Sequence, residues 1–95
     1  AMEKTAGQVS NLLKVLANER RLLILCQLVE GEMAVGEIAQ RLNLRDATTS
    51  QQLALLRKDG LVSHRREAQT VFYSLARDDV RQLMEFLYRQ YCQTA

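Results

Sequence analysis

Apolar residues recur along the first half of the chain at intervals of three and four residues, the spacing of amphipathic helices. A first stripe consists of Val9, Leu12, Leu13 and Leu16. A later, shorter stripe consists of Val35, Ile38, Ala39 and Leu42. The segment from Leu22 to Val29 between them is apolar on nearly every face, which predicts a central buried helix. We expect Asn18 to cap the start of that helix and Gly31 to end it.

The second half of the chain predicts one more helix, a hairpin and a last helix. The fourth helix is expected from about Asp46 to Asp59, with Gly60 as its left-handed stop. Residues 61–66 and 70–75 are short and rich in β-branched and aromatic side chains, and the polar link 67–69 joins them, which favours a β-hairpin. The last helix starts at Asp78 and ends near Cys92. Its apolar stripe consists of Val80, Leu83, Met84, Leu87 and Tyr91.

This order of elements predicts a mainly α-helical fold with a small β-hairpin. Two short helices joined by a tight turn and followed by a two-stranded wing form a winged helix-turn-helix. The chain has 95 residues, enough for one small domain, and we assign residues 3–95 to a single winged-helix DNA-binding domain. Ala1, which precedes Met2, is expected to be a remnant of the expression vector.

Composition excludes several classes of protein. Hydrophobic residues make up 47% of the chain and charged residues 25%, as in globular proteins. We find no apolar run of membrane-spanning length and no secretory signal pattern, so we expect a cytoplasmic protein without a membrane partner. The net charge of +2 excludes a polybasic tail but allows a local basic patch.

The fourth helix is expected to present a polar face to DNA. A helical wheel places Thr49 with the inward-facing Leu53 and Leu56. The opposite face and its flanks carry Ala47, Thr48, Ser50 and Gln51. Gln pairs with adenine, Ser and Thr bond to bases or phosphates, and the methyl groups of Ala and Thr contact that of thymine. For this helix alone, a merely solvated face is the stronger interpretation.

The predicted hairpin makes a DNA-binding face more favourable than a merely solvated face. His64, Arg65 and Arg66 precede its tip and Gln69 follows it, where a wing meets phosphates or a minor groove. The long apolar stripes of the first and last helices exceed what one small core needs, so we expect them to pack in a two-fold homodimer. Its recognition helices would lie about 34 Å apart and read an inverted repeat in double-stranded DNA.

Three stretches resemble the ArsR family of bacterial winged-helix regulators: ANERRLLIL (17–25), TSQQLALLRKDGLV (49–62) and RREAQTVFYSL (65–75). The resemblance implies a homodimer that binds operator DNA and responds to an inducer. The residues that bind metal in the family are missing from this chain, because residues 33–37 contain no cysteine and residues 78–92 contain no histidine. The single imidazole, His64, lies on a predicted strand. We therefore expect no metal and no cofactor.

The cysteine pair resembles the sulfur-responsive branch of the family, to which BigR, SqrR and HlyU belong. In that branch one cysteine of the second helix and one of the last helix form the sensor, and Cys26 and Cys92 stand at those places. The resemblance implies a dithiol switch for reactive sulfur species, or for other oxidants, whose oxidation releases DNA. Whether the product is a disulfide or a polysulfide, and whether binding represses or activates, stays open.

Three other interpretations compete with the sensor. In the first interpretation both thiols are inert, because cysteine is commonly a small buried apolar residue. The protein is then an ArsR-type regulator that acts as an anti-silencing activator. A thiol peroxidase-type enzyme is the second, but the chain has no Cys-x-x-Cys motif, no βαβ pattern and no histidine partner. The third is a winged helix that contacts only protein.

Two positions depart from the family pattern near the fourth helix. Arg45 stands where the family usually has Ser, which adds a potential phosphate contact and removes a capping hydroxyl, unless Asp46 takes that role. Thr49 stands where Leu or Val is usual. Operator preference and helix stability are therefore not transferred from the family to this chain.

Overall fold

The computed structural model describes the backbone of residues 2–92 and the side chains of residues 5–91. The first half contains α1 (Met2–Leu16), α2 (Glu19–Gln27), the 3-10 segment η1 (Leu28–Glu30), β1 (Met33–Ala34) and α3 (Val35–Leu42). The second half contains α4 (Asp46–Lys58), β2 (Val62–Glu67), β3 (Thr70–Leu75), α5 (Asp78–Leu87) and the π-helical segment η2 (Tyr88–Cys92). The predicted fold, mainly helical with a winged helix-turn-helix, is confirmed.

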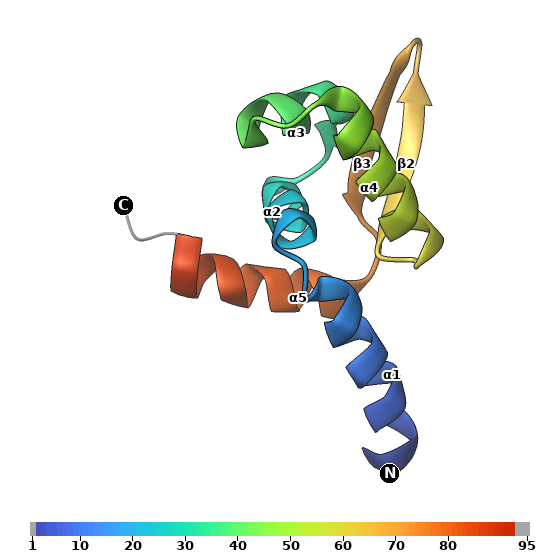
Figure 1. The fold of residues 1–95 in the computed structure, drawn as a ribbon. Helices are drawn as coiled ribbons and strands as arrows, with labels where there is room; N and C mark the ends of the chain where they lie inside the picture. The colour runs from blue at the N-terminus through green and yellow to red at the C-terminus, as the bar shows by residue number, and fades with distance from the viewer. Residues whose placement is uncertain (1, 93–95) are drawn as a thin grey trace.

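The hairpin and α1 project from the helical body in different directions (Figure 1). α4 runs alongside β2 and β3, while α5 lies across the opposite end of the molecule, where α1 departs. This arrangement leaves the hairpin tip and the first turns of α4 at one end of the molecule, and α1 and α5 at the other.

Two helix ends differ from the prediction. α2 ends at Gln27 and continues as η1, so Gly31 ends the 3-10 segment rather than the α-helix. α5 ends at Leu87 and continues as η2 to Cys92.

Several other helix ends lie where local chemistry predicts them. The side-chain oxygen of Asn18 accepts a hydrogen bond from the backbone N–H of Arg21 at 3.1 Å, so the predicted cap of α2 is confirmed. Asn43 ends α3 in the left-handed conformation with φ 56°, and Gly60 follows α4 with φ 79°. Gly60 serves there because it adopts positive φ at no steric cost.

The core lies between α2, α3, α4 and α5. Its fully buried side chains are Ile24, Leu25, Leu28, Ile38, Leu53, Leu56, Val80 and Met84. α2 is the central helix, as predicted, but the expectation that it is buried on nearly every face is wrong for Leu23, which is 45% exposed. Leu23 lies on the side of α2 that borders an open cavity, and no element within the described residues covers it.

The wing is the hairpin of β2 and β3, and it belongs to a three-stranded antiparallel sheet in the order β1-β3-β2. The hairpin is confirmed, but its turn is shorter than expected, because Glu67 pairs with Thr70 and only Ala68 and Gln69 connect the strands. β1 was not predicted. It pairs with β3 through Met33 opposite Tyr73 and Ala34 opposite Phe72, and so joins the wing to the segment between α2 and α3.

α1 and the end of α5 keep apolar side chains at the surface. Val9 is 47% exposed, Leu13 50% and Phe86 48%. No helix within the described residues combines the length and the apolar character needed to cross a membrane.

Candidate functional site

The first turns of α4 expose small polar side chains over a buried anchor. Thr49, Leu53 and Leu56 are fully buried, as the helical wheel predicted. Ala47, Ser50 and Gln51 are exposed and Thr48 is half-buried. The polar face of this helix is therefore open at its N-terminal half.

The N-terminus of α4 has no side-chain cap. Arg45 occupies the capping position and forms no capping bond through its side chain, so the loss of a capping hydroxyl is confirmed. Asp46 is the first residue of the helix and does not replace that cap. Its carboxylate lies in the first turn, where the helix dipole favours negative charge. The exposed Arg45 precedes it at the end of the α3–α4 turn.

A groove of about 560 Å³ separates the start of α4 from the wing. Its walls bring together Ala47 and Ser50 of α4 and Gln69 of the hairpin turn, three residues that the sequence assigned to DNA. The other lining residues are Ala34, Val35, Gly36, Asp46, Thr70, Val71 and Tyr73. Most of these side chains are small, so another molecule can approach the backbone closely. The other residues that the sequence assigned to DNA do not line this groove: Arg45, Thr48, Gln51, Arg65 and Arg66.

The two neighbouring arginines of β2 lie on opposite faces of the wing. Arg66 pairs with Val71, and Val71 lines the groove, so Arg66 belongs to the groove side. Arg65 pairs with Phe72 on the other face. His64 lies on the groove side against Tyr73, with ring centroids 5.5 Å apart.

Arg65 is held by two carboxylates. Its Nε and Nη2 donate to the two carboxylate oxygens of Glu32, each at 2.7 Å, and its Nη1 donates to Glu67 at 2.8 Å. The guanidinium also lies over the ring of Phe72, 4.6 Å from its centroid. The hydrogen bond from Arg65 lowers the pKa of Glu32, and the carboxylates raise the pKa of Arg65. Sequence analysis assigned Arg65 to DNA and missed Glu32.

A second contact that the sequence did not reveal fastens α4 to α2. Nε of Arg21 donates to the side-chain oxygen of Gln52 at 3.1 Å. Arg21 and Gln52 lie 31 positions apart, so no local pattern pairs them. The contact restrains the middle of α4, while the buried leucines hold its inner side.

Cys26 is half-buried on α2 and lines an apolar cavity of about 560 Å³. Leu22 and Leu23 of α2 line the same cavity, as do Leu87 of α5 and Tyr91 of η2. Cys92 is the last residue of η2, directly after Tyr91, and its side chain lies outside the described part of the structure. Within the described residues, no three His, Cys, Asp or Glu side chains form a group that could hold a metal ion.

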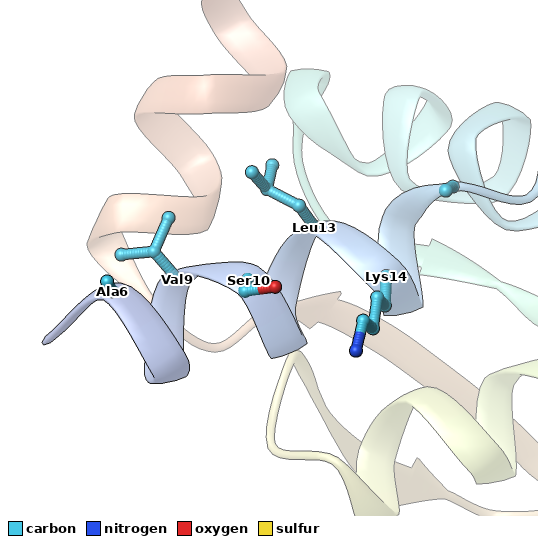
Figure 2. A pocket seen from close by; sticks show the side chains of 6 residues that line it. Ala6, Val9, Ser10, Leu13 and Lys14 are labelled. Carbon is cyan, nitrogen blue, oxygen red and sulfur yellow. The ribbon is translucent and has the colours of Figure 1, made fainter.

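The outward face of α1 is apolar and concave. A cavity of about 480 Å³ lies along it, lined by Ala6, Val9, Ser10, Leu13, Lys14 and Ala17. Figure 2 shows Val9 and Leu13 projecting to the same side of the helix. The other side of α1 borders the body of the same chain, because Leu12 and Val15 lie beside Leu61.

The chain is similar in sequence to bacterial transcriptional regulators. The family model of bacterial regulatory proteins of the arsR family matches residues 18–64. The transcriptional activator HlyU of Vibrio cholerae is 53% identical over 92 residues, which cover 97% of this chain and 85% of HlyU. The biofilm growth-associated repressor of Agrobacterium fabrum is 49% identical, covering 97% of this chain and 79% of the repressor.

Solved structures of related proteins share the fold. Reduced HlyU from Vibrio cholerae matches with a TM-score of 0.91 at 53% identity, over 97% of each chain. The homodimeric winged helix-turn-helix DNA-binding domain Mb0332 from Mycobacterium bovis matches with a TM-score of 0.79 at 36% identity. That match covers 97% of this chain and 85% of Mb0332.

Proposed function

Because the chain belongs to the ArsR family of bacterial regulatory proteins and is a transcriptional regulator rather than an enzyme, we propose that it binds operator DNA as a homodimer. We further propose that a dithiol formed by Cys26 and Cys92 controls this binding. Residues 3–95 act as one DNA-binding domain in the cytoplasm of a bacterium.

The groove between α4 and the wing carries the proposal for DNA. Small side chains of α4 and Gln69 of the turn face one another across it, so a nucleic-acid backbone can enter. The base-contacting residues are Ala47, Thr48, Ser50 and Gln51, and the backbone-contacting residues are Arg45, Arg66 and Gln69. Arg65 is not included in this set, because its guanidinium is paired with Glu32 and Glu67.

Dimerisation through α1 and α5 is supported by their exposed apolar side chains. Val9, Leu13 and Phe86 are each about half exposed, which is unfavourable in an isolated subunit. The related Mb0332 domain is homodimeric. A two-fold dimer repeats the recognition helix about one DNA turn away, so the operator is an inverted repeat.

The thiol switch is supported by the cavity that Cys26 lines. Tyr91 lines the same cavity and directly precedes Cys92, so the two cysteines belong to neighbouring segments of one subunit. A link between them ties the end of α5 to α2. Because we assign α5 to the dimer interface, the link changes the separation of the two recognition helices. A coupling of about 1–3 kcal/mol changes DNA affinity by roughly 5- to 150-fold.

The chemistry proceeds by thiol exchange with a hydropersulfide, RSSH. The thiolate of Cys26 attacks the terminal sulfur, the S–S bond breaks, and RS⁻ leaves, which gives a Cys26 persulfide. The thiolate of Cys92 then attacks Sγ of the Cys26 persulfide and expels the outer sulfur as HS⁻, so the dithiol is oxidised to a disulfide by two electrons and RSSH is reduced to RSH and H₂S. If Cys92 is also persulfidated, a third RSSH oxidises the two persulfides to a tetrasulfide and yields RSH and H₂S.

The distance between the Cα atoms of Cys26 and Cys92 decides whether a disulfide or a polysulfide forms. A direct disulfide requires Cα atoms within about 7 Å, whereas a polysulfide spans a wider gap. A wide gap therefore favours reactive sulfur over peroxide as the inducer. The names of the relatives include both an activator and a repressor, so either direction of control fits this DNA-binding unit.

Binding of a duplex selected from a random pool tests the proposal. We expect the reduced dimer to bind an inverted repeat, with an affinity that falls steeply with salt. Treatment with a persulfide donor is expected to weaken binding at least 5-fold and to produce a Cys26–Cys92 bridge in the intact-mass spectrum. Cys26→Ser and Cys92→Ser variants should bind DNA normally and ignore the donor. A normal response by both variants would exclude the thiol switch.

A further inference from the structure

Arg65 spans the wing from one outer strand to the segment beside the other. Its backbone belongs to β2, and its guanidinium lies over Phe72 of the central strand β3. Two of its nitrogens donate to Glu32, the residue before β1. The backbone pairing of β1 with β3 involves only two residue pairs. The Arg65–Glu32 contact therefore extends the short backbone pairing of β1 with β3 and adds to the packing of Val62, Tyr73 and Leu75 in the core.

The geometry of this contact is that of a firm ion pair. Both carboxylate oxygens of Glu32 accept from different nitrogens of one planar guanidinium, which defines direction as well as distance. Glu67 occupies a third donor of the same group. Exposed pairs generally contribute little, but paired bidentate contacts in a network are the exception.

The local charge is unfavourable for a phosphate. Two carboxylates, Glu32 and Glu67, surround the single guanidinium of Arg65, so this cluster carries one net negative charge. Three of the five N–H donors of Arg65 are engaged by these carboxylates, and a phosphate that approached the other two would be repelled by both carboxylate charges. Arg66, by contrast, forms no ion pair with any described residue and lies on the same face of the hairpin as Val71, which lines the groove.

From this arrangement we propose that Arg65 is a positioning residue that holds the wing against the helical body through Glu32, and that Arg66 is the arginine of the wing that meets the DNA backbone. The inference rests on the proposed DNA binding by α4 and the wing. It assigns different roles to two adjacent residues of the same chemistry. Glu32 carries a negative charge, as DNA does, but its ion pair with Arg65 makes it a residue that supports DNA binding.

Fluorescence anisotropy with the selected duplex, measured over a range of KCl concentrations, tests this assignment. Arg66→Gln removes one phosphate contact from each subunit, so the slope of log K against log salt should become shallower by about 2 in the dimer. Arg65→Gln should weaken binding about 3- to 10-fold and leave the slope unchanged. Arg65→Lys should behave like Arg65→Gln, because it keeps the charge but lacks the planar fork.

Glu32→Gln gives the sharpest result, because the two possible roles of Arg65 predict opposite signs. If Glu32 positions Arg65, the variant binds DNA about 3- to 10-fold more weakly. If Glu32 merely competes with phosphate for Arg65, the variant binds more tightly. The double variant Glu32→Gln/Arg65→Gln should be no weaker than either single variant, since both remove the same contact.

Glu37→Gln is the matched control. Glu37 also pairs with an arginine, Arg41 at 2.9 Å, and its side chain is similarly exposed, but the pair lies within α3. This variant makes the same change in net charge and should not weaken binding. Thermal unfolding of each variant checks that the fold is retained.

The outcomes separate the inference from the proposal on which it rests. Tighter binding by Glu32→Gln, or a shallower salt slope for Arg65→Gln, would overturn the positioning role while DNA binding itself stands. If the unaltered protein binds no duplex in a salt-dependent manner, both the inference and the proposed function fail. Weaker binding by Glu32→Gln and Arg65→Gln at an unchanged slope supports the inference.

Discussion

The buried hydroxyl of Thr49 donates a hydrogen bond to the backbone carbonyl of Arg45 at 3.0 Å, across the first turn of α4. The backbone N–H of Thr49 donates to the same carbonyl, also at 3.0 Å. These two residues are the positions where the chain departs from the pattern of its family near the recognition helix. The N-terminus of α4 lacks a side-chain cap, and the hydroxyl of Thr49 adds a second hydrogen bond across its first turn.

Thr49→Val tests this bond. Valine has the same shape but lacks the hydroxyl, so we expect the free energy of unfolding to fall by about 1 kcal/mol. Thr48→Val is the matched control, because Thr48 is the neighbouring half-buried threonine and the change in helix propensity is the same. The control should stay within about 0.5 kcal/mol in urea denaturation. Equal effects of the two substitutions would show that the hydroxyl of Thr49 does not stabilise α4.

Two adjacent leucines of α4 allow the effect of burial on stability to be measured apart from the effect of helix propensity. Leu56 is fully buried in the core, whereas Leu55 is 39% exposed. Leu56→Ala should lower the free energy of unfolding by about 2–5 kcal/mol, because it removes apolar contacts and leaves a cavity. Leu55→Ala should change it by less than about 1 kcal/mol. Urea denaturation of both variants checks the difference, and a comparable loss for Leu55→Ala would contradict the orientation of α4.

The Arg65–Glu32 pair predicts a pH dependence of stability. Arg65 lowers the pKa of Glu32 in the folded protein, so the pair stabilises the fold above the pKa of glutamate in the unfolded chain, about 4.3. This contribution is lost as the pH falls through the lowered pKa. The difference in Tm between the unaltered protein and Glu32→Gln should therefore be constant above about pH 5 and should close toward pH 3.

Arg65→Gln serves as the companion variant in this titration. It removes the other partner of the same pair, so its Tm difference should narrow over the same pH range, and the part that arises from the contact with Phe72 should remain. A difference that persists unchanged at pH 3 would mean that the ionised form of Glu32 does not contribute to stability.

The apolar face of α1 predicts the oligomeric state. Leu13→Glu places a charge on the concave face that Val9 and Leu13 share, and a charge without a partner is costly to bury in an interface. We expect the dimer dissociation constant to rise by at least about 100-fold in sedimentation equilibrium. Leu55→Glu makes the same substitution on an exposed leucine of α4 and should leave the dimer intact. An undisturbed Leu13→Glu dimer would move the interface away from this face of α1.

The polar face of the recognition helix could be predicted from the sequence, but the composition of the site could not. Helical periodicity alone separates Thr49, Leu53 and Leu56 from the exposed residues of α4. The alternation of a strand also predicts that Arg65 and Arg66 lie on opposite faces. Which of the two faces the groove depends on how the hairpin packs on α4, and that packing has no local signal.

The sequence by itself determined the order of the five helices and the hairpin and several of their ends, because periodicity, caps and turn residues act over a few positions. Asn18, Asn43 and Gly60 are examples in which one side chain or one backbone conformation decides where a helix starts or stops. Only the tertiary structure decided the strand β1, the exposure of Leu23 and the pairing of Arg65 with Glu32. Each depends on contacts between segments far apart in the chain, which exist only after the helices and the hairpin have packed together.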